Sequence, residues 1–183
     1  ILQRKYIEEF LKMRMSLIIP IVMLLLLILS RMITEIPNFT ATIALIIFTG
    51  YLIRNKLLSV FVILLSQVIS DLYIGIYSSM VFVYGAYVVI GLISPIVMNK
   101  LSAKSVLTAS LISPSIFYIV SNFGVWVTGS TYTMDLQGLI SCYVAGIPFF
   151  DETLLSTIIF SITIFVMMKL IVKKPEELVL VKK

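Results

Sequence analysis

The stretch Ser16–Thr34 reads SLIIPIVMLLLLILSRMIT, and Arg31 is its one charged residue. A helix that crosses a bilayer needs about 20 predominantly apolar residues, and this stretch has that length. Pro20 lies near the start of the run, where a helix tolerates proline. No small-residue cleavage site follows, because Arg31, Glu35 and Pro37 come next. We therefore interpret the run as a retained transmembrane helix rather than a signal peptide.

The composition of the whole chain favours the same conclusion. Of its 183 residues, 60% are hydrophobic and 13% are charged, whereas soluble domains carry about 25% charged residues. So short a chain could not bury this much apolar surface in a water-soluble core. We therefore expect one domain whose surroundings are the lipid bilayer. The net charge of +5 comes without a basic-aromatic stripe or a nucleic-acid motif, so no nucleic-acid partner is expected.

Further apolar segments follow the first one, and together they predict an all-α fold. The six predicted spans are Ser16–Thr34, Phe39–Ile53, Leu57–Ser70, Met80–Met98, Leu101–Val120 and Leu154–Val172. The chain thus divides into an N-terminal arm (1–15), a transmembrane domain (16–172) and a basic C-terminal tail (173–183). The fold class predicted is a polytopic transmembrane bundle of about six helices.

The distribution of basic residues predicts the orientation of this bundle. Cytoplasmic loops collect Lys and Arg. With the N-terminus inside, 13 of the 14 Lys and Arg residues fall on the inner side, and Arg31 alone falls outside. An odd number of spans would spoil this division, so we predict that both termini lie inside (N-in/C-in).

The N-terminal arm mixes charges with apolar residues at helical spacing, namely Leu2, Tyr6, Phe10 and Met13. Two interpretations fit this pattern. The arm is an amphipathic helix that lies in the membrane interface, or it is a simple helical extension of the first span.

The connections predicted to face outward are acidic, aromatic and rich in Gly and Asn. The longest runs from Ser121 to Thr153, and connections longer than about 15 residues usually carry structure or function. Within it, Leu136–Phe149 is mostly apolar but too short to span, which favours an interfacial or re-entrant segment before the last helix. The alternative for its aromatic residues, such as Trp126 and Tyr132, is an interfacial belt.

Polar residues at the outer helix ends are the candidate ligand-binding residues. Asp71 ends an apolar helix, and a carboxylate near hydrocarbon is a functional candidate. It could also pair with Arg31 or cap the next turn. Asn122 has donors and an acceptor suited to a polar ligand, although Asn also ends helices. The predicted binding residues are Asn38, Asp71, Tyr73, Asn122, Trp126 and Tyr143.

Missing residue types exclude several kinds of chemistry. The chain has no His and a single cysteine, Cys142, so common zinc sites and Ser-His or Cys-His nucleophile pairs cannot form. No Gly-Lys-Ser/Thr loop for ATP is present. We expect no catalytic residue, no metal and no cofactor. An intramembrane enzyme would have to use Asp71, Asp135 or Cys142. Cys142 is interpreted as a packed residue, with thiolate ligation of a metal as the alternative.

Four separated motifs resemble a known family. They are Asn38–Leu45, Ser70–Gly75, Asn122–Trp126 and Cys142–Phe150. In this order they resemble an uncharacterised family of small, mostly bacterial, six-helix membrane proteins, and the resemblance covers Ile36–Phe165.

That family is similar, in length and helix count, to the substrate-binding S-components of energy-coupling-factor vitamin transporters. This second resemblance implies a small-molecule cavity at the outer face and a partnership with a transmembrane coupling protein and its ATPases. Many S-components carry an Ala-x-x-x-Ala contact motif on the first helix, whereas the first span here contains no alanine.

Two functions are therefore carried forward. The first is a membrane-embedded substrate-binding subunit for uptake of a small molecule, such as a vitamin or precursor, without its own ATPase. The alternative is a non-catalytic accessory subunit of a larger membrane protein complex. Both predict a multi-pass protein of a bacterial inner membrane or an organelle inner membrane.

Overall fold

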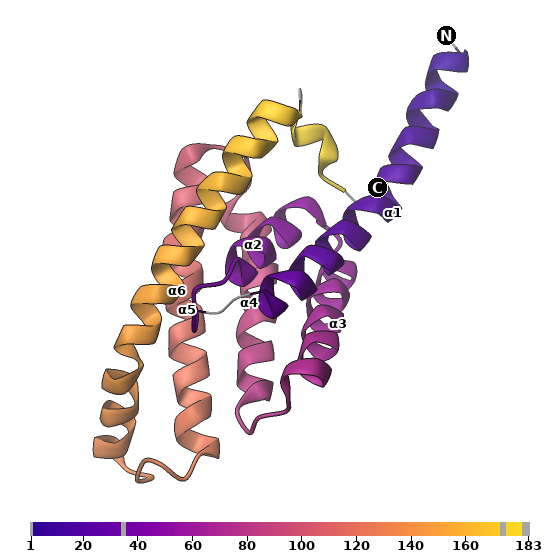
Figure 1. The fold of residues 1–183 in the computed structure, drawn as a ribbon. Helices are drawn as coiled ribbons and strands as arrows, with labels where there is room; N and C mark the ends of the chain where they lie inside the picture. The colour runs from indigo at the N-terminus through magenta and orange to yellow at the C-terminus, as the bar shows by residue number, and fades with distance from the viewer. Residues whose placement is uncertain (1, 34–35, 173–174, 181–183) are drawn as a thin grey trace.

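A computed structural model describes residues 2–33, 36–172 and 175–180 of the chain. The described residues form six α-helices and one short 3₁₀ helix (Figure 1). Their bounds are α1 Leu2–Met32, α2 Thr42–Leu52, α3 Lys56–Ile74, α4 Met80–Val97, α5 Ala103–Thr128, α6 Leu136–Ile171 and η1 Pro175–Leu178. The predicted all-α fold with six helices is confirmed. All helices except α2 are long and apolar enough to cross a membrane, as expected of a multi-pass integral membrane protein.

Helix α2 differs most from its prediction. The sequence predicted a second span over Phe39–Ile53, but α2 has 11 residues, Thr42–Leu52, and each of them is buried. At 1.5 Å per residue it rises about 16 Å, roughly half of the hydrocarbon thickness. Asn38 has a positive φ of 60°, and helical structure begins only at Thr42. Helix α2 is thus a short central helix, enclosed by the longer ones.

Glycines allow α2 to approach α4 closely. A Cβ built on Gly50 would collide with the carbonyl oxygen of Gly91 and lie 2.9 Å from the Cβ of Ser94. The contact involves backbone, which cannot turn aside as a side chain can. By contrast, a Cβ on Gly85, in the same helix α4, meets no atom within 4 Å.

We predict that Gly50→Ala destabilises the protein by about 1–3 kcal/mol through overpacking. The matched control Gly85→Ala should be neutral, or stabilising by up to about 1 kcal/mol because alanine favours a helix. Thermal unfolding in detergent can be followed with a thiol-reactive dye, since Cys142 is the sole cysteine and is buried. Equal melting temperatures for the two variants would contradict the proposed close contact.

The basic connections meet at one end of the bundle. The Arg54 guanidinium donates to three backbone carbonyls near the α4–α5 connection, those of Pro95 (2.9 Å), Met98 (3.2 Å) and Asn99 (3.3 Å). The Arg54 amide donates to the Leu180 carbonyl at 3.1 Å, which brings the end of the chain to the same place. This clustering agrees with the division of charges in the sequence. The N-in/C-in orientation relative to the membrane stays a prediction.

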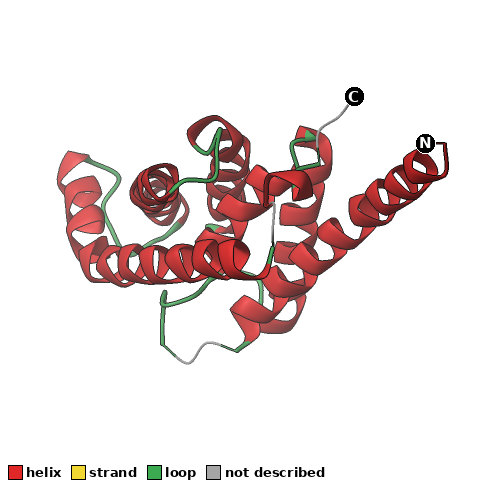
Figure 2. Cartoon of the chain, turned by 90° about the horizontal axis from the view of Figure 1, so that it is seen from above, coloured by secondary structure: helices red, strands yellow, loops and turns green. Residues whose placement is uncertain are grey.

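Helix α1 continues without a break from Leu2 to Met32. The N-terminal arm is therefore helical and extends the first span, and its first turns project away from the other helices (Figures 1 and 2). Its position in the membrane interface stays a prediction, as do the boundaries proposed for arm, bundle and tail. Residues 173–174 and 181–183 of the tail lie outside the described residues.

The segment Leu136–Phe149 is not a separate interfacial or re-entrant helix. It forms the first turns of α6, which runs for 36 residues, about 54 Å. The connection from α5 is therefore short, residues 129–135. Aromatic contacts explain the difference: the Tyr118 and Tyr143 rings pack edge to face, with centroids 5.5 Å apart. The apolar segment thus packs against the C-terminal half of α5 instead of folding back alone.

Asp135 caps the start of α6. Its carboxylate accepts hydrogen bonds from the Gly138 amide (2.7 Å) and the Thr133 hydroxyl (2.8 Å). These two hydrogen bonds hold the pKa of Asp135 below its ordinary value of 3.8.

A lowered folded pKa gives the Asp135 cap a specific pH dependence. Its stabilising effect should be complete above the unfolded value and be lost as the pH falls through the lowered folded value. We therefore expect hydrogen exchange at Gly138, relative to the unstructured rate, to accelerate only below pH 3.8. The Asp135→Asn variant can still cap but does not titrate, so its protection should not change over this range. The same acid-induced loss in that variant would contradict this assignment.

Candidate functional site

A buried ion pair lies at the end of the bundle opposite Arg54. Arg31, in the last turn of α1, donates from Nη2 to Oδ1 of Asp71 near the end of α3, at 2.6 Å. The two side chains are 13% and 2% exposed. Of the roles considered for Asp71 from sequence, pairing with Arg31 is therefore the one that the structure has.

Further hydrogen bonds complete this pair. Arg31 Nη1 donates to Oε1 of Gln67 at 2.7 Å, and the Tyr84 hydroxyl donates to Oδ2 of Asp71 at 2.6 Å. The network joins α1, α3 and α4. Tyr77, in the α3–α4 connection, also shares a hydrogen bond with Arg31. Burial, and then the Asp71 charge, raise the pKa of Tyr77 above 10.0, so its hydroxyl keeps its proton.

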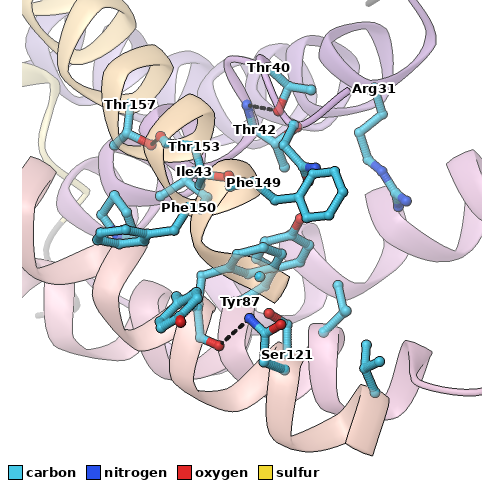
Figure 3. A pocket seen from close by; sticks show the side chains of 18 of the residues that line it. Arg31, Thr40, Thr42, Ile43, Tyr87, Ser121, Phe149, Phe150, Thr153 and Thr157 are labelled. Atoms are coloured by element: carbon cyan, nitrogen blue, oxygen red, sulfur yellow. Dashed lines mark hydrogen bonds between the residues drawn. The ribbon is translucent and has the colours of Figure 1, made fainter. Parts of the chain in front are cut away.

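A cavity of about 400 Å³ lies beside this network. Figure 3 shows Arg31 on one side of it and Phe150 and Thr157 on the other. Helices α1 to α6 all contribute to its walls. The lining residues are Arg31, Asn38, Thr40, Thr42, Ile43, Ile74, Tyr77, Val83, Tyr87, Pro114, Phe117, Tyr118, Ser121, Asn122, Val125, Gly146, Phe149, Phe150, Thr153 and Thr157.

The residues that line the cavity include both buried and exposed ones. Thr42, Tyr87 and Thr157 line it and are buried. Asn38 and Phe149 are exposed and belong to its rim. Its volume falls in the range of about 300–1,000 Å³ that is usual for small-molecule sites. The cavity is thus of a size and shape that could hold a small organic molecule.

Helices α5 and α6 shape the far wall through a close contact. A Cβ on Gly146 would collide with Oδ1 of Asn122, so glycine at this position lets the two helices approach. The Asn122 amide nitrogen donates to the Tyr118 carbonyl at 2.8 Å. The Cys142 Sγ donates to the Asn122 carbonyl at 3.4 Å, and Cys142 is buried. Cys142 is therefore a packed residue in this seam.

Two of the six predicted binding residues, Asn38 and Asn122, line the cavity. Asp71 lies behind Arg31 and does not line it. Tyr73 does not line the cavity either, and it is 77% exposed.

Trp126 and Tyr143 make hydrogen bonds outside the cavity. The Trp126 indole nitrogen donates to the Thr133 carbonyl at 2.9 Å, and the Tyr143 hydroxyl donates to the Ile119 carbonyl at 2.7 Å. Both residues belong to the α5–α6 hairpin and neither lines the cavity.

The sequence did contain a signal for the cavity residues that were missed. On α5, the lining residues Pro114, Phe117, Tyr118, Ser121, Asn122 and Val125 recur at helical spacing. On α6, Gly146, Phe149, Phe150, Thr153 and Thr157 do the same. Each set is one face of a helix that mixes aromatic and hydroxyl side chains. A face of this kind differs from an ordinary lipid-facing stripe.

These features define a multi-pass helical membrane protein with a cavity of small-molecule size at one end. The chain belongs to a family of unknown function, DUF6580, whose model matches residues 11–178. Membership in an uncharacterised family of this kind is what the four sequence motifs indicated. No curated protein and no solved structure matches the chain. The similarity to S-components has no support from these comparisons.

The ion pair leads to a stability prediction. Asp71→Asn would leave the Arg31 cation buried without its counterion, which should cost about 3–5 kcal/mol. The double substitution Arg31→Met with Asp71→Asn removes both charges and keeps an acceptor for Tyr84, so it should cost less than Asp71→Asn alone. Unfolding with the thiol-reactive dye measures both. If the double variant loses as much stability as Arg31→Met alone and Asp71→Asn alone lose together, the two residues are not coupled.

Proposed function

We propose that this protein is a membrane-embedded substrate-binding subunit, similar to an S-component, for uptake of a small molecule such as a vitamin or precursor. The observation that carries the proposal is the cavity of about 400 Å³ beside the Arg31–Asp71 pair. Buried threonines and the buried ring of Tyr87 line it, which is unusual for a gap between helices that only faces lipid. Such convergence of polar groups on an apolar pocket is typical of ligand sites.

The location of the cavity supports uptake from outside. Its lining includes Thr42 and Ile43 at the start of α2, whereas Arg54 follows the other end of that helix. If the basic end faces the cytoplasm, as the charge distribution predicts, the mouth faces outward. A ligand could then enter the cavity without crossing the bilayer first.

The energy for uptake would come from other subunits. No ATP-binding loop occurs in the sequence, so this role requires a separate transmembrane coupling protein with ATPases. The usual alanine contact motif is missing, because α1 contains no alanine from Leu2 to Met32. Docking would therefore use a different surface from that of many S-components.

The second candidate function is a non-catalytic accessory subunit of a larger membrane complex. It is favoured by α1, whose outward residues form an apolar stripe that includes Leu17, Ile21, Leu25 and Leu29. A helix of a partner subunit could cover this stripe in place of lipid. Co-purification in a gentle detergent distinguishes the two functions, because only an accessory subunit requires a stoichiometric complex without a bound small molecule.

The proposed function predicts that a small molecule co-purifies with the protein and is released in native mass spectrometry. Ser121 lines the cavity, so Ser121→Trp should fill it and abolish the bound mass. Ser115 lies on the same helix but does not line the cavity, so Ser115→Trp should retain the bound mass. Wild-type protein from native membranes without any bound small molecule would overturn the proposal.

A further inference from the structure

The aromatic rings of the cavity indicate the shape of its ligand. Tyr87 and Phe117 line it and stack on each other, with centroids 5.2 Å apart and planes 10° from parallel. Tyr118 and Phe150 pack together at 4.9 Å on the α5–α6 side. Flat rings that enclose a space favour a flat occupant, because stacked and edge-to-face contacts add to simple burial.

The polar groups of the cavity indicate that the ligand has hydrogen-bonding edges. Asn38 and Asn122 contribute amides, and threonines on α2 and α6 contribute hydroxyls. Thr153 and Thr157 are buried, and each hydroxyl donates to a backbone carbonyl one turn earlier, at 2.7 Å. Their oxygens can still accept a hydrogen bond. A saturated hydrocarbon would leave these groups unmatched, which costs free energy in a buried site.

The charges around the cavity indicate a neutral ligand. Among the described residues that line it, Arg31 alone is charged. Its charge is already compensated by Asp71 at 2.6 Å, directly behind it. A charged ligand would bring an additional, uncompensated charge into a low-dielectric site, and this is costly. The guanidinium, which lies nearer to the cavity than its counterion, favours acceptor groups such as carbonyl oxygens.

We propose that the cavity binds a planar, uncharged heteroaromatic molecule that carries carbonyl or ring-nitrogen acceptors. The ring lies among Tyr87, Phe117 and Phe150, and an acceptor edge faces Arg31. This inference rests on the proposed function and specifies its substrate class. The Arg31–Asp71 pair thereby selects ligands by net charge, in addition to joining α1 to α3.

Three probes with the same bicyclic ring test this proposal. They are quinoline-3-carboxamide, which is neutral, quinoline-3-carboxylate, an anion, and 1-methylquinolinium-3-carboxamide, a cation. Binding to the full chain in nanodiscs is measured by calorimetry after native ligand has been removed. We expect the neutral amide to bind at least tenfold more tightly than either ion. Tighter or equal binding of an ion, or no binding of any probe, overturns the proposal.

Variants separate the effect of charge from that of shape. Asp71→Asn leaves Arg31 uncompensated, so preference should shift at least tenfold toward the anion. Arg31→Met with Asp71→Asn restores neutrality and should restore preference for the amide. Phe117→Leu removes a ring from the wall and should weaken all three probes, whereas Phe123→Leu, outside the cavity, should weaken none. An unchanged charge preference in Asp71→Asn would overturn the proposed role of the pair.

The outcomes also separate this inference from the proposed function. Neutral-selective binding in a protein that supports no uptake in cells would remove the transport function and leave the inference intact. A charged molecule released from the native protein in mass spectrometry would overturn the inference and leave the transport function intact.

Discussion

The ion pair between Arg31 and Asp71 is the interaction on which the cavity end of this structure depends. A carboxylate or guanidinium at the edge of hydrocarbon is costly unless it is paired and hydrogen-bonded. Both Asp71 oxygens have partners, since Arg31 donates to one and Tyr84 to the other, each at 2.6 Å. Because these residues come from α1, α3 and α4, satisfying the charges fixes the relative positions of three helices. The same geometry places the guanidinium on the wall of the cavity.

At the opposite end of the bundle, around Arg54, backbone polar groups at the helix ends need hydrogen-bond partners. The last carbonyls of a helix have no partner within it. Arg54 donates to three carbonyls around the end of α4, and Leu180 pairs with the backbone that follows α2. The Arg54 side chain therefore closes the end of α4, and the Leu180 amide, which donates to the Leu52 carbonyl, closes the end of α2. The contact of Gly50 with Gly91 then lets α2 lie directly against α4.

The two ends together explain why a cavity lies at the Arg31 end of the bundle. Helix α2 is about 16 Å long, so it fills the Arg54 end of the bundle and leaves space beyond Thr42. The α5–α6 hairpin continues past this point and provides the far wall, with Gly146 packed against Asn122. The Arg31 network closes the opposite wall. A central helix that is shorter than its neighbours thus creates a space that the proposed function can use.

The sequence by itself determined the all-α class and the approximate positions of most helices, and it named Arg31 as one possible partner of Asp71, beside capping and ligand binding. Apolar runs of membrane length have few alternatives to a helix in lipid. Arg31 was the one basic residue on the side that the sequence predicts to face outward. Tertiary structure alone decided that Leu136–Phe149 joins α6, because the decisive Tyr118–Tyr143 contact connects separate helices. It also decided that Asn38 and Asn122 line the cavity whereas Trp126 and Tyr143 do not. Helical periodicity shows which residues share a face, but only the packing of helices decides which face meets a neighbour, a cavity or lipid.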